Sequence, residues 1–387
     1  MVRQFLEDMT DDEAQFRAGV RGWASARVIP GSAERDVTGQ YPGELIRDLS
    51  SLGAMGISVP ETLGGLGLPL AVQLAAIEEV AFADAALASI YTAHYLAVEA
   101  LRVGASVEQS KSLLPGLAAG GQLGAFALTE PDSGSDIASM RTRAQAEGDG
   151  WKLSGSKTFI SNAKEADLLV VFAKTDPGAG FRGISCFAVP GGSAGLNFSD
   201  PQDKCGLRSA PTYTVFLDEV AVPREALLGA LGAGGKIALQ ALNGARIDIA
   251  AMATGIAARA LHLAVEYATS RQQFGSPLAG FQAIQLLVGE MWTLLRAARL
   301  SAWAAAARKD RGLDIREDAS MAKYLATENC FRVVDHALQI HGGTGYMRET
   351  EIERLYRDCR VLRIYEGTSQ IQLLGIGRAA LRSAHAG

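Results

Sequence analysis

The sequence lacks the features that mark secreted, metal-binding and membrane-spanning proteins. It has four cysteines in no CxxC pair and no metal-like spacing, so we predict buried, reduced thiols and no metal site: Cys186, Cys205, Cys330 and Cys359. No apolar run reaches the ~20 residues that a bilayer-spanning helix requires. The start of the chain, Met1–Asp8, lacks the apolar run of a signal peptide and is too acidic for a transit peptide. We therefore expect a cytoplasmic protein without membrane insertion.

An excess of positive charge is also missing. The formal net charge is −5, which gives no reason to expect nucleic acid or an anionic membrane as a partner. Apolar residues, by contrast, make up 48% of the 387 residues, against 20% that are charged. A chain of this length exceeds one ordinary core, so two or three domains are expected. It contains no internal repeat and no low-complexity linker.

Secondary-structure signals divide the chain into three predicted domains, which makes the fold class mainly α with an inserted β-domain. Residues 1–121 are predicted to be helical, residues 122–230 to form a β-sandwich or barrel, and residues 231–387 to form a four-helix bundle. The predicted helices are Asp11–Arg27, Gly43–Leu52, Leu70–Val103, Val107–Ala118, Gly235–Ser270, Phe281–Lys309, Glu317–Gln339 and Gly367–Ser383. The predicted strands are Leu123–Leu128, Trp151–Ile160, Leu168–Lys174, Ile184–Val189 and Tyr213–Leu217.

Four polar or glycine-rich segments are candidates for ligand contacts, although each has an ordinary structural explanation. Leu128–Asp136 follows a predicted strand and could offer N–H and hydroxyl groups to a phosphate or polar ring, or be a turn cluster. Gly155–Asn162 resembles a turn and strand, and Arg271–Gly275 resembles a helix C-cap. Gln339–Tyr346 is a helix end followed by glycines, where a single histidine is more often structural than catalytic.

A fifth segment, Tyr365–Gln372, places one carboxylate, Glu366, between an apolar approach and a glycine. Thr368 and Ser369 follow and are suited to cap the last predicted helix. Gly367 allows the backbone to bend and a ligand to approach closely. For Glu366 in isolation, the simpler interpretation is an acid that complements the helix dipole.

Taken together and in order, these motifs resemble those of the acyl-CoA dehydrogenase family, and the resemblance covers essentially the whole chain. The matching segments are Leu128–Asp136, Gly155–Asn162, Lys204–Thr212, Asn243–Arg246, Arg271–Gly275, Gln339–Tyr346 and Tyr365–Gln372. The resemblance implies a helical domain, a β-domain and a four-helix bundle, in agreement with the division above. It also implies FAD as cofactor, a homo-oligomer that is usually a tetramer, and electron-transferring flavoprotein as electron acceptor.

The resemblance assigns expected roles residue by residue. Glu366 matches the catalytic base. Residues that match FAD contacts within one subunit are Phe126, Leu128, Thr129, Gly134, Ser135, Phe159, Ser161, Thr368 and Gln370. Residues that match contacts made by a neighbouring subunit, or that complete that site, are Arg271, Phe274, Gln282, Gln339, Gly342 and Gly343. Expected substrate contacts are Ser135, Asn243, Arg246, Tyr365 and Gly367.

The implied reaction is α,β-dehydrogenation of an acyl thioester. Glu366 would abstract the α-proton in a site that excludes water, and its backbone N–H and a flavin hydroxyl would stabilise the enolate-like oxygen. The β-hydrogen would leave as hydride to flavin N5. Some relatives carry the base directly before the arginine that matches Arg246, but Ala245 occupies that place here and cannot act.

The identity of the acyl group stays open. No Lys or Arg occurs from Leu70 to Leu101, which disfavours a dicarboxylate, and bulky residues that could form a pocket floor favour a short or medium chain: Tyr91, His94, Tyr95 and Tyr365. Asn243 stands where many relatives have Asp, so an acyl-carrier-protein thioester is an alternative to acyl-CoA. An oxygen-using acyl-CoA oxidase and a non-catalytic acyl-binding scaffold are further alternatives, and flavin absorbance and peroxide release would distinguish them.

Overall fold

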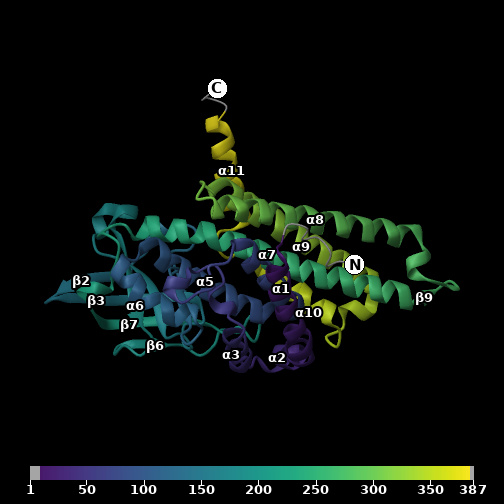
Figure 1. The fold of residues 1–387 in the computed structure, drawn as a ribbon, viewed down its shortest axis with the longest axis horizontal. Coiled ribbons are helices and arrows are strands. Elements are labelled where there is room, and N and C mark those ends of the chain that lie inside the picture. Colours follow the sequence, from purple (N-terminus) through teal and green to yellow (C-terminus); the bar gives the residue numbers. More distant parts are fainter. Residues whose placement is uncertain (1–8, 384–387) are drawn as a thin grey trace.

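The computed structural model describes residues 9–383. Met1–Asp8, where the sequence predicts no signal peptide, lie outside the described residues, as do residues 384–387. The chain forms an N-terminal helical part, a middle β-sheet and a C-terminal helical part, as predicted, and Figure 1 shows the sheet at one end of the long C-terminal helices.

The N-terminal part consists of short helices around two buried ones. Its helices are α1 (Asp11–Trp23), α2 (Ser32–Thr38), α3 (Gly43–Ser51), α4 (Leu70–Ala83), α5 (Ala85–Gly104) and α6 (Val107–Ala118). The run that predicts one helix over 70–103 is two, because Asp84 adopts an extended backbone between them. Its carboxylate accepts hydrogen bonds from Ala86 N and Leu87 N and so caps α5.

Buried carboxylates of α4 are neutralised by arginines from other helices. Glu79 accepts hydrogen bonds from Arg17 and Arg21 of α1, and Glu78 pairs with Arg299 of the C-terminal part. Charges in so apolar a helix are tolerated because each has a partner of opposite sign. The pairs also fix the orientation of α4 against its neighbours.

The middle part is one eight-stranded sheet. Its strands are β1 (Gly124–Ala127), β2 (Arg143–Glu147), β3 (Gly150–Ser161), β4 (Leu168–Lys174), β5 (Ile184–Pro190), β6 (Leu196–Phe198), β7 (Thr212–Pro223) and β8 (Leu227–Leu228). The order is β6-β7-β3-β2-β4-β5-β8, and β1 pairs with β4 in parallel. The five predicted strands are present. The sequence did not predict β2, β6 and β8, which are short; β2 also has mostly exposed residues.

The C-terminal part is built on three long helices, α7 (Gly234–Ser270), α8 (Gln282–Asp310) and α9 (Arg316–His341), with α10 (Glu351–Cys359) packed beside them. A short hairpin, β9 (Gln272–Gln273) and β10 (Ser276–Pro277), joins α7 to α8. By length and composition alone α7 could cross a membrane, but 83% of its most apolar window is buried inside the protein. It is therefore the core helix of the bundle in this fold.

The last helix, α11 (Ser369–Ser383), differs from the prediction that it forms the fourth long member of the bundle. It packs against α9 near its start and then projects away from the bundle, as Figure 1 shows. Leu373, Leu374 and Leu381 on this helix are exposed. An isolated chain therefore leaves an apolar surface of α11 uncovered.

Candidate active site

Two of the predicted flavin-binding segments lie side by side in the sheet. Thr158 N of β3 donates a hydrogen bond to Thr129 O at 2.8 Å. Lys157 Nζ, fully buried, donates to Leu128 O at 3.1 Å and to Glu130 Oε1 at 2.8 Å. The loop after β1 and the C-terminal half of β3 therefore form one surface, although about 30 residues separate them in the sequence.

Phe159 lies on this surface in an unusual conformation. Its φ is +59° and its side chain is 67% exposed, at an irregularity of the β3–β7 pairing between Lys157 and Ile160. A bulge of this kind turns a side chain out of the regular alternation. Gly134 and Ser135, in the adjacent loop after β1, are also exposed, and nothing crowds the Gly134 backbone. An exposed ring near uncrowded polar backbone suits a flat, polar ring system such as a flavin.

The other predicted flavin contacts lie at the opposite end of the bundle. They are exposed and come from the α7–α8 hairpin, the start of α8 and the end of α9: Arg271, Phe274, Gln282, Gln339, Gly342 and Gly343. Figure 1 shows β9, in that hairpin, at the far end of the molecule from β2 and β3. A single chain does not bring the two groups together, which agrees with the expectation that the second group serves a neighbouring subunit. His341 stacks on Tyr267 and binds Ala337 O, so its role is structural.

Glu366 lies in a tight turn between α10 and α11. Its φ is +52° and that of Gly367 is +93°, so two successive residues are left-handed, a strained conformation for a glutamate. Three side chains hold this turn by its carbonyl oxygens, two of them from distant positions in the sequence and the third, Gln372, from the following helix. Arg246 Nε and Gln372 Nε2 donate to Glu366 O, while Lys323 Nζ and Gln372 Nε2 donate to Gly367 O at 2.8 and 2.9 Å.

Arg246 is itself fixed on α7. Its Nη1 donates to Asn243 Oδ1 at 2.7 Å and to Ser320 Oγ at 3.4 Å. The hydrogen-bond partners of Arg246 are neutral oxygens, so within residues 9–383 it does not form a helix-surface ion pair. Glycine suits position 367 because its φ of +93° is one that residues with a side chain rarely adopt.

The environment of the Glu366 carboxyl group favours its neutral form. The pKa of Glu366 is raised to about 8: burial is the largest cause, the charge of Asp248 adds to it, and the charges of Lys323 and Arg246 oppose the shift. Oε2 is completely enclosed and has no hydrogen-bond partner among residues 9–383. A carboxylate in this position is a stronger base than one in water and has an unoccupied acceptor site.

Some residues around Glu366 have roles that the neighbouring sequence predicts, and others do not. Thr368 caps α11, because its Oγ1 accepts from Ile371 N, whereas Ser369 is buried and binds Glu328. Gln370 is exposed. Lys323, Ser320 and the anchoring role of Gln372 were not predicted, and only Gln372 lies within a segment that the sequence marked.

The candidate pocket-floor residues on α5 are tied to the backbone. Tyr91 and Tyr95 both donate to Ala54 O, and His94 lies between Met55 O and Gly124 N. Gly124 N must donate, so His94 Nδ1 accepts and Nε2 carries the proton, in agreement with burial that lowers the pKa of His94 to about 4. Tyr365 Oη contacts Met252 Sδ at 3.4 Å. Ala245 is buried and offers no base.

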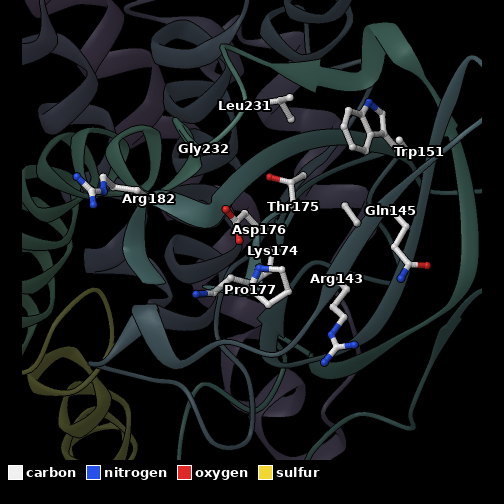
Figure 2. Close-up of a pocket in the computed structure, with 12 residues that line it drawn as sticks. Arg143, Gln145, Trp151, Lys174, Thr175, Asp176, Pro177, Arg182, Leu231 and Gly232 are labelled. Atoms are coloured by element: carbon white, nitrogen blue, oxygen red, sulfur yellow. The ribbon is translucent and has the colours of Figure 1, made fainter. Parts of the chain in front are cut away.

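A cavity of about 610 Å³ lies elsewhere, between the sheet and the loop that precedes α7. Its lining includes Arg143, Lys174 and Arg182, and none of the predicted site residues. Figure 2 shows Arg143 and Arg182 at different sides of it, and Lys174 Nζ is occupied by Gly180 O at 2.6 Å. Because the cations do not converge, the Glu366 turn remains the better candidate for chemistry.

Comparison with known proteins agrees with this geometry. Family models for the N-terminal, middle and C-terminal domains of acyl-CoA dehydrogenase match residues 10–121, 125–220 and 232–381. The short-chain specific acyl-CoA dehydrogenase of Bos taurus mitochondria is 39% identical over 97% of this chain and 92% of its own length. Butyryl-CoA dehydrogenase from Megasphaera elsdenii superposes with a TM-score of 0.95 at 37% identity, covering 97% of this chain and 100% of that one.

A third relative carries a different substrate in its name. The prolyl acyl carrier protein oxidase AnaB superposes with a TM-score of 0.93 at 31% identity, covering 96% of this chain and 99% of that one. The three domain models match in order, and the relatives align over nearly the whole chain, so all comparisons indicate the same family. The protein belongs to the acyl-CoA dehydrogenase family of flavin-dependent oxidoreductases that act on CH–CH bonds.

Proposed function

We propose that the protein catalyses α,β-dehydrogenation of a short- or medium-chain acyl thioester, most simply an acyl-CoA, with Glu366 as the base and FAD as cofactor. The observation that carries the proposal is the Glu366 carboxyl group: enclosed, unpartnered at Oε2, raised in pKa and held on a strained turn. Purely structural glutamates are normally hydrogen-bonded when buried.

In this proposal the turn performs two tasks. Glu366 removes the α-proton of the thioester, and its raised pKa makes that transfer less unfavourable. Glu366 N has no acceptor among residues 9–383 and can donate to the thioester oxygen as negative charge develops there. Arg246, Lys323 and Gln372 keep the turn from relaxing, which preserves the direction of both groups.

The exposed Phe159 ring and the uncrowded loop residues Gly134 and Ser135 support a flavin held by the β-domain. Phe126, Leu128, Thr129, Gly134, Ser135, Phe159 and Ser161 would hold it from the β-domain, with Thr368 and Gln370 from the start of α11. A bound FAD would supply the acceptor for the two electrons and the hydrogen that leave Cβ. Ser135, Asn243, Arg246, Tyr365 and Gly367 would contact the thioester.

The proposal also includes assembly and an electron acceptor. The second set of predicted flavin contacts lies at the end of the bundle opposite the β-sheet, and α11 exposes leucines. Both features support a homo-oligomer, which we propose is a tetramer in which one subunit completes the FAD site of another. The family assignment supports electron-transferring flavoprotein as the acceptor.

Replacement of Glu366 by Gln tests the proposal. The amide keeps the size of the side chain but cannot accept the proton, so E366Q should retain flavin absorbance and lose nearly all anaerobic bleaching by acyl-CoA substrates. Equal bleaching by E366Q and wild type would refute Glu366 as the base. A colourless wild-type protein would instead refute the flavin.

A carrier-protein thioester is the second candidate substrate. Two features favour it: Asn243 stands where many relatives have Asp, and the chain is similar to a prolyl acyl carrier protein oxidase. Bleaching by an acyl-carrier-protein thioester but not by the corresponding acyl-CoA would establish this alternative. Peroxide release under air would identify an oxidase.

A further inference from the structure

Asp248 is a buried carboxyl group that the proposed chemistry does not use. It lies on α7, is 5% exposed, and is flanked by the fully buried Ile247 and Ile249. Burial raises its pKa to about 7. A carboxyl group in an apolar helix core is costly unless it has partners or a function.

Among residues 9–383, only one carboxylate oxygen of Asp248 has a hydrogen-bond donor. Gln73 Nε2 of α4 donates to Asp248 Oδ1 at 2.9 Å, and Gln73 Oε1 accepts from Ser58 Oγ at 2.6 Å. Gln73 is therefore fixed with its amide nitrogen toward the carboxyl group. Asp248 Oδ2 has no hydrogen-bond partner among residues 9–383, and, unlike Glu366 Oε2, it is not completely enclosed by the fold.

Within residues 9–383, no cation forms an ion pair with Asp248. Lys309 and Arg102 act on it from a distance and lower its pKa, while Glu99 opposes them. Both cations are engaged elsewhere, since Lys309 Nζ lies 2.6 Å from Glu99 Oε1 and Arg102 Nη1 lies 3.4 Å from Glu99 Oε2. The carboxyl group thus keeps a free acceptor and an unbalanced negative charge when ionised.

Asp248 also lies near the reaction centre. It shares a face of α7 with Met252, one turn further on, and Met252 contacts Tyr365 directly before Glu366. The charge of Asp248 acts on Glu366, and it also acts on Tyr91 of α5. The group therefore lies among α4, α5, α7 and the Glu366 turn, the part of the fold in which we place the acyl chain of the proposed reaction.

We propose that Asp248, oriented by Gln73, selects acyl thioesters that carry a hydroxyl or amino group toward the end of the chain over aliphatic chains of the same length. This inference rests on the proposed function, because it assigns the acyl group of that reaction. A terminal donor would bind the free oxygen, whereas a terminal methyl would bury it without a partner. Sites built to hydrogen-bond a substrate group reject the analogue that lacks it.

Matched CoA thioesters in which a terminal hydroxyl replaces a terminal methyl test the inference. We expect the wild-type holoenzyme to prefer the hydroxyl member of at least one pair, 3-hydroxypropanoyl-CoA against butanoyl-CoA or 6-hydroxyhexanoyl-CoA against heptanoyl-CoA, by at least ~10-fold in kcat/KM. Titration calorimetry of the same pairs gives the ratio of dissociation constants. The binding ratio does not depend on turnover.

Asp248→Leu should abolish or invert the preference, and Gln73→Met, which frees the carboxyl group, should reduce it. Asp310→Asn is the matched control, because Asp310 binds Leu70 N at the start of α4 and should not affect the ratio. The inference would be overturned if the wild type preferred the methyl member in every pair, or if it bound no thioester at all. It would also be overturned if the hydroxyl-to-methyl ratio were unchanged in both Asp248→Leu and Gln73→Met. If Asp248→Leu fails to fold, the ratio in Gln73→Met decides. Binding with the expected ratio but without oxidation would refute the proposed reaction alone.

Discussion

The buried pair of Lys157 and Glu130 gives a prediction whose size can be worked out from the structure. Lys157 is 0% exposed and Glu130 5%. Lys157 Nζ donates to Glu130 Oε1 and Leu128 O, while the same carboxylate accepts from Arg141 N and Thr142 N. Every bond in this cluster ends on the loop that carries the predicted flavin contacts, so the pair connects that loop to β3.

Replacement of Lys157 by Met should be strongly destabilising. It leaves the Glu130 carboxylate buried without its cation and Leu128 O without that donor, and removal of one partner of a buried pair costs about 3–5 kcal/mol. Unfolding entropy is about 2.1 cal/mol/K per residue, or about 0.8 kcal/mol/K for 387 residues. The midpoint of thermal unfolding should therefore fall by about 4–6 °C.

Differential scanning fluorimetry measures the loss of stability, and flavin absorbance after gel filtration measures the loss of bound flavin. K157M should lose flavin as well as stability, and the double variant K157M/E130Q should recover part of the midpoint because no uncompensated charge remains. Lys152→Met on the same strand is the control, since Lys152 pairs only with the exposed Glu147 and Glu219 and its loss should leave the midpoint unchanged. A midpoint for K157M equal to that of wild type would show that the pair does not hold the loop.

Two further predictions concern pH and assembly. The pKa of Glu366 is raised to about 8 and its carboxylate is the active form, so kcat/KM of the free enzyme should rise with pH to a plateau above about 8. Asp248→Asn should move the midpoint of that profile to lower pH and Lys323→Met to higher pH; shifts in the opposite directions would contradict the electrostatic account. Leu374→Glu on α11 should reduce the assembly size measured by light scattering together with flavin content, whereas an unchanged mass would place the interface elsewhere.

Local signals in the sequence predicted most elements of the fold. The long helices and five strands followed from periodicity and β-branched content, since burial of one face leaves a regular pattern. The break at Asp84 was missed because its cause is a side chain that caps the next helix within an otherwise uninterrupted apolar run. Strand β2 was missed because four of its five residues are exposed and carry no alternating pattern.

The candidate site was predictable to the extent that it is contiguous in the chain. Glu366, Gly367 and Thr368 were found because glycine and a capping hydroxyl mark a turn before a helix. The left-handed backbone of Glu366 has no such signal in the sequence. The side chains that hold it, Arg246 and Lys323, lie 120 and 44 residues before the carbonyl groups that they bind, and only the fold brings them close. Tertiary anchors of this kind require the packing of α7 and α9 to be known.

The same reasoning explains why the acyl specificity escaped the sequence. Asp248 sits in an apolar helix, where a single polar residue gives no motif, and its partner Gln73 lies 175 residues away. Only the packing of α4 against α7 shows that one oxygen is anchored and the other is free. Because the charge of Asp248 also raises the pKa of Glu366, a substrate that binds this oxygen would change the basicity of the catalytic group as well as its own affinity. A substrate ammonium group paired with Asp248 would compensate its charge and should lower the pKa of Glu366, so for such a substrate selection and proton abstraction would be coupled through one buried carboxyl group.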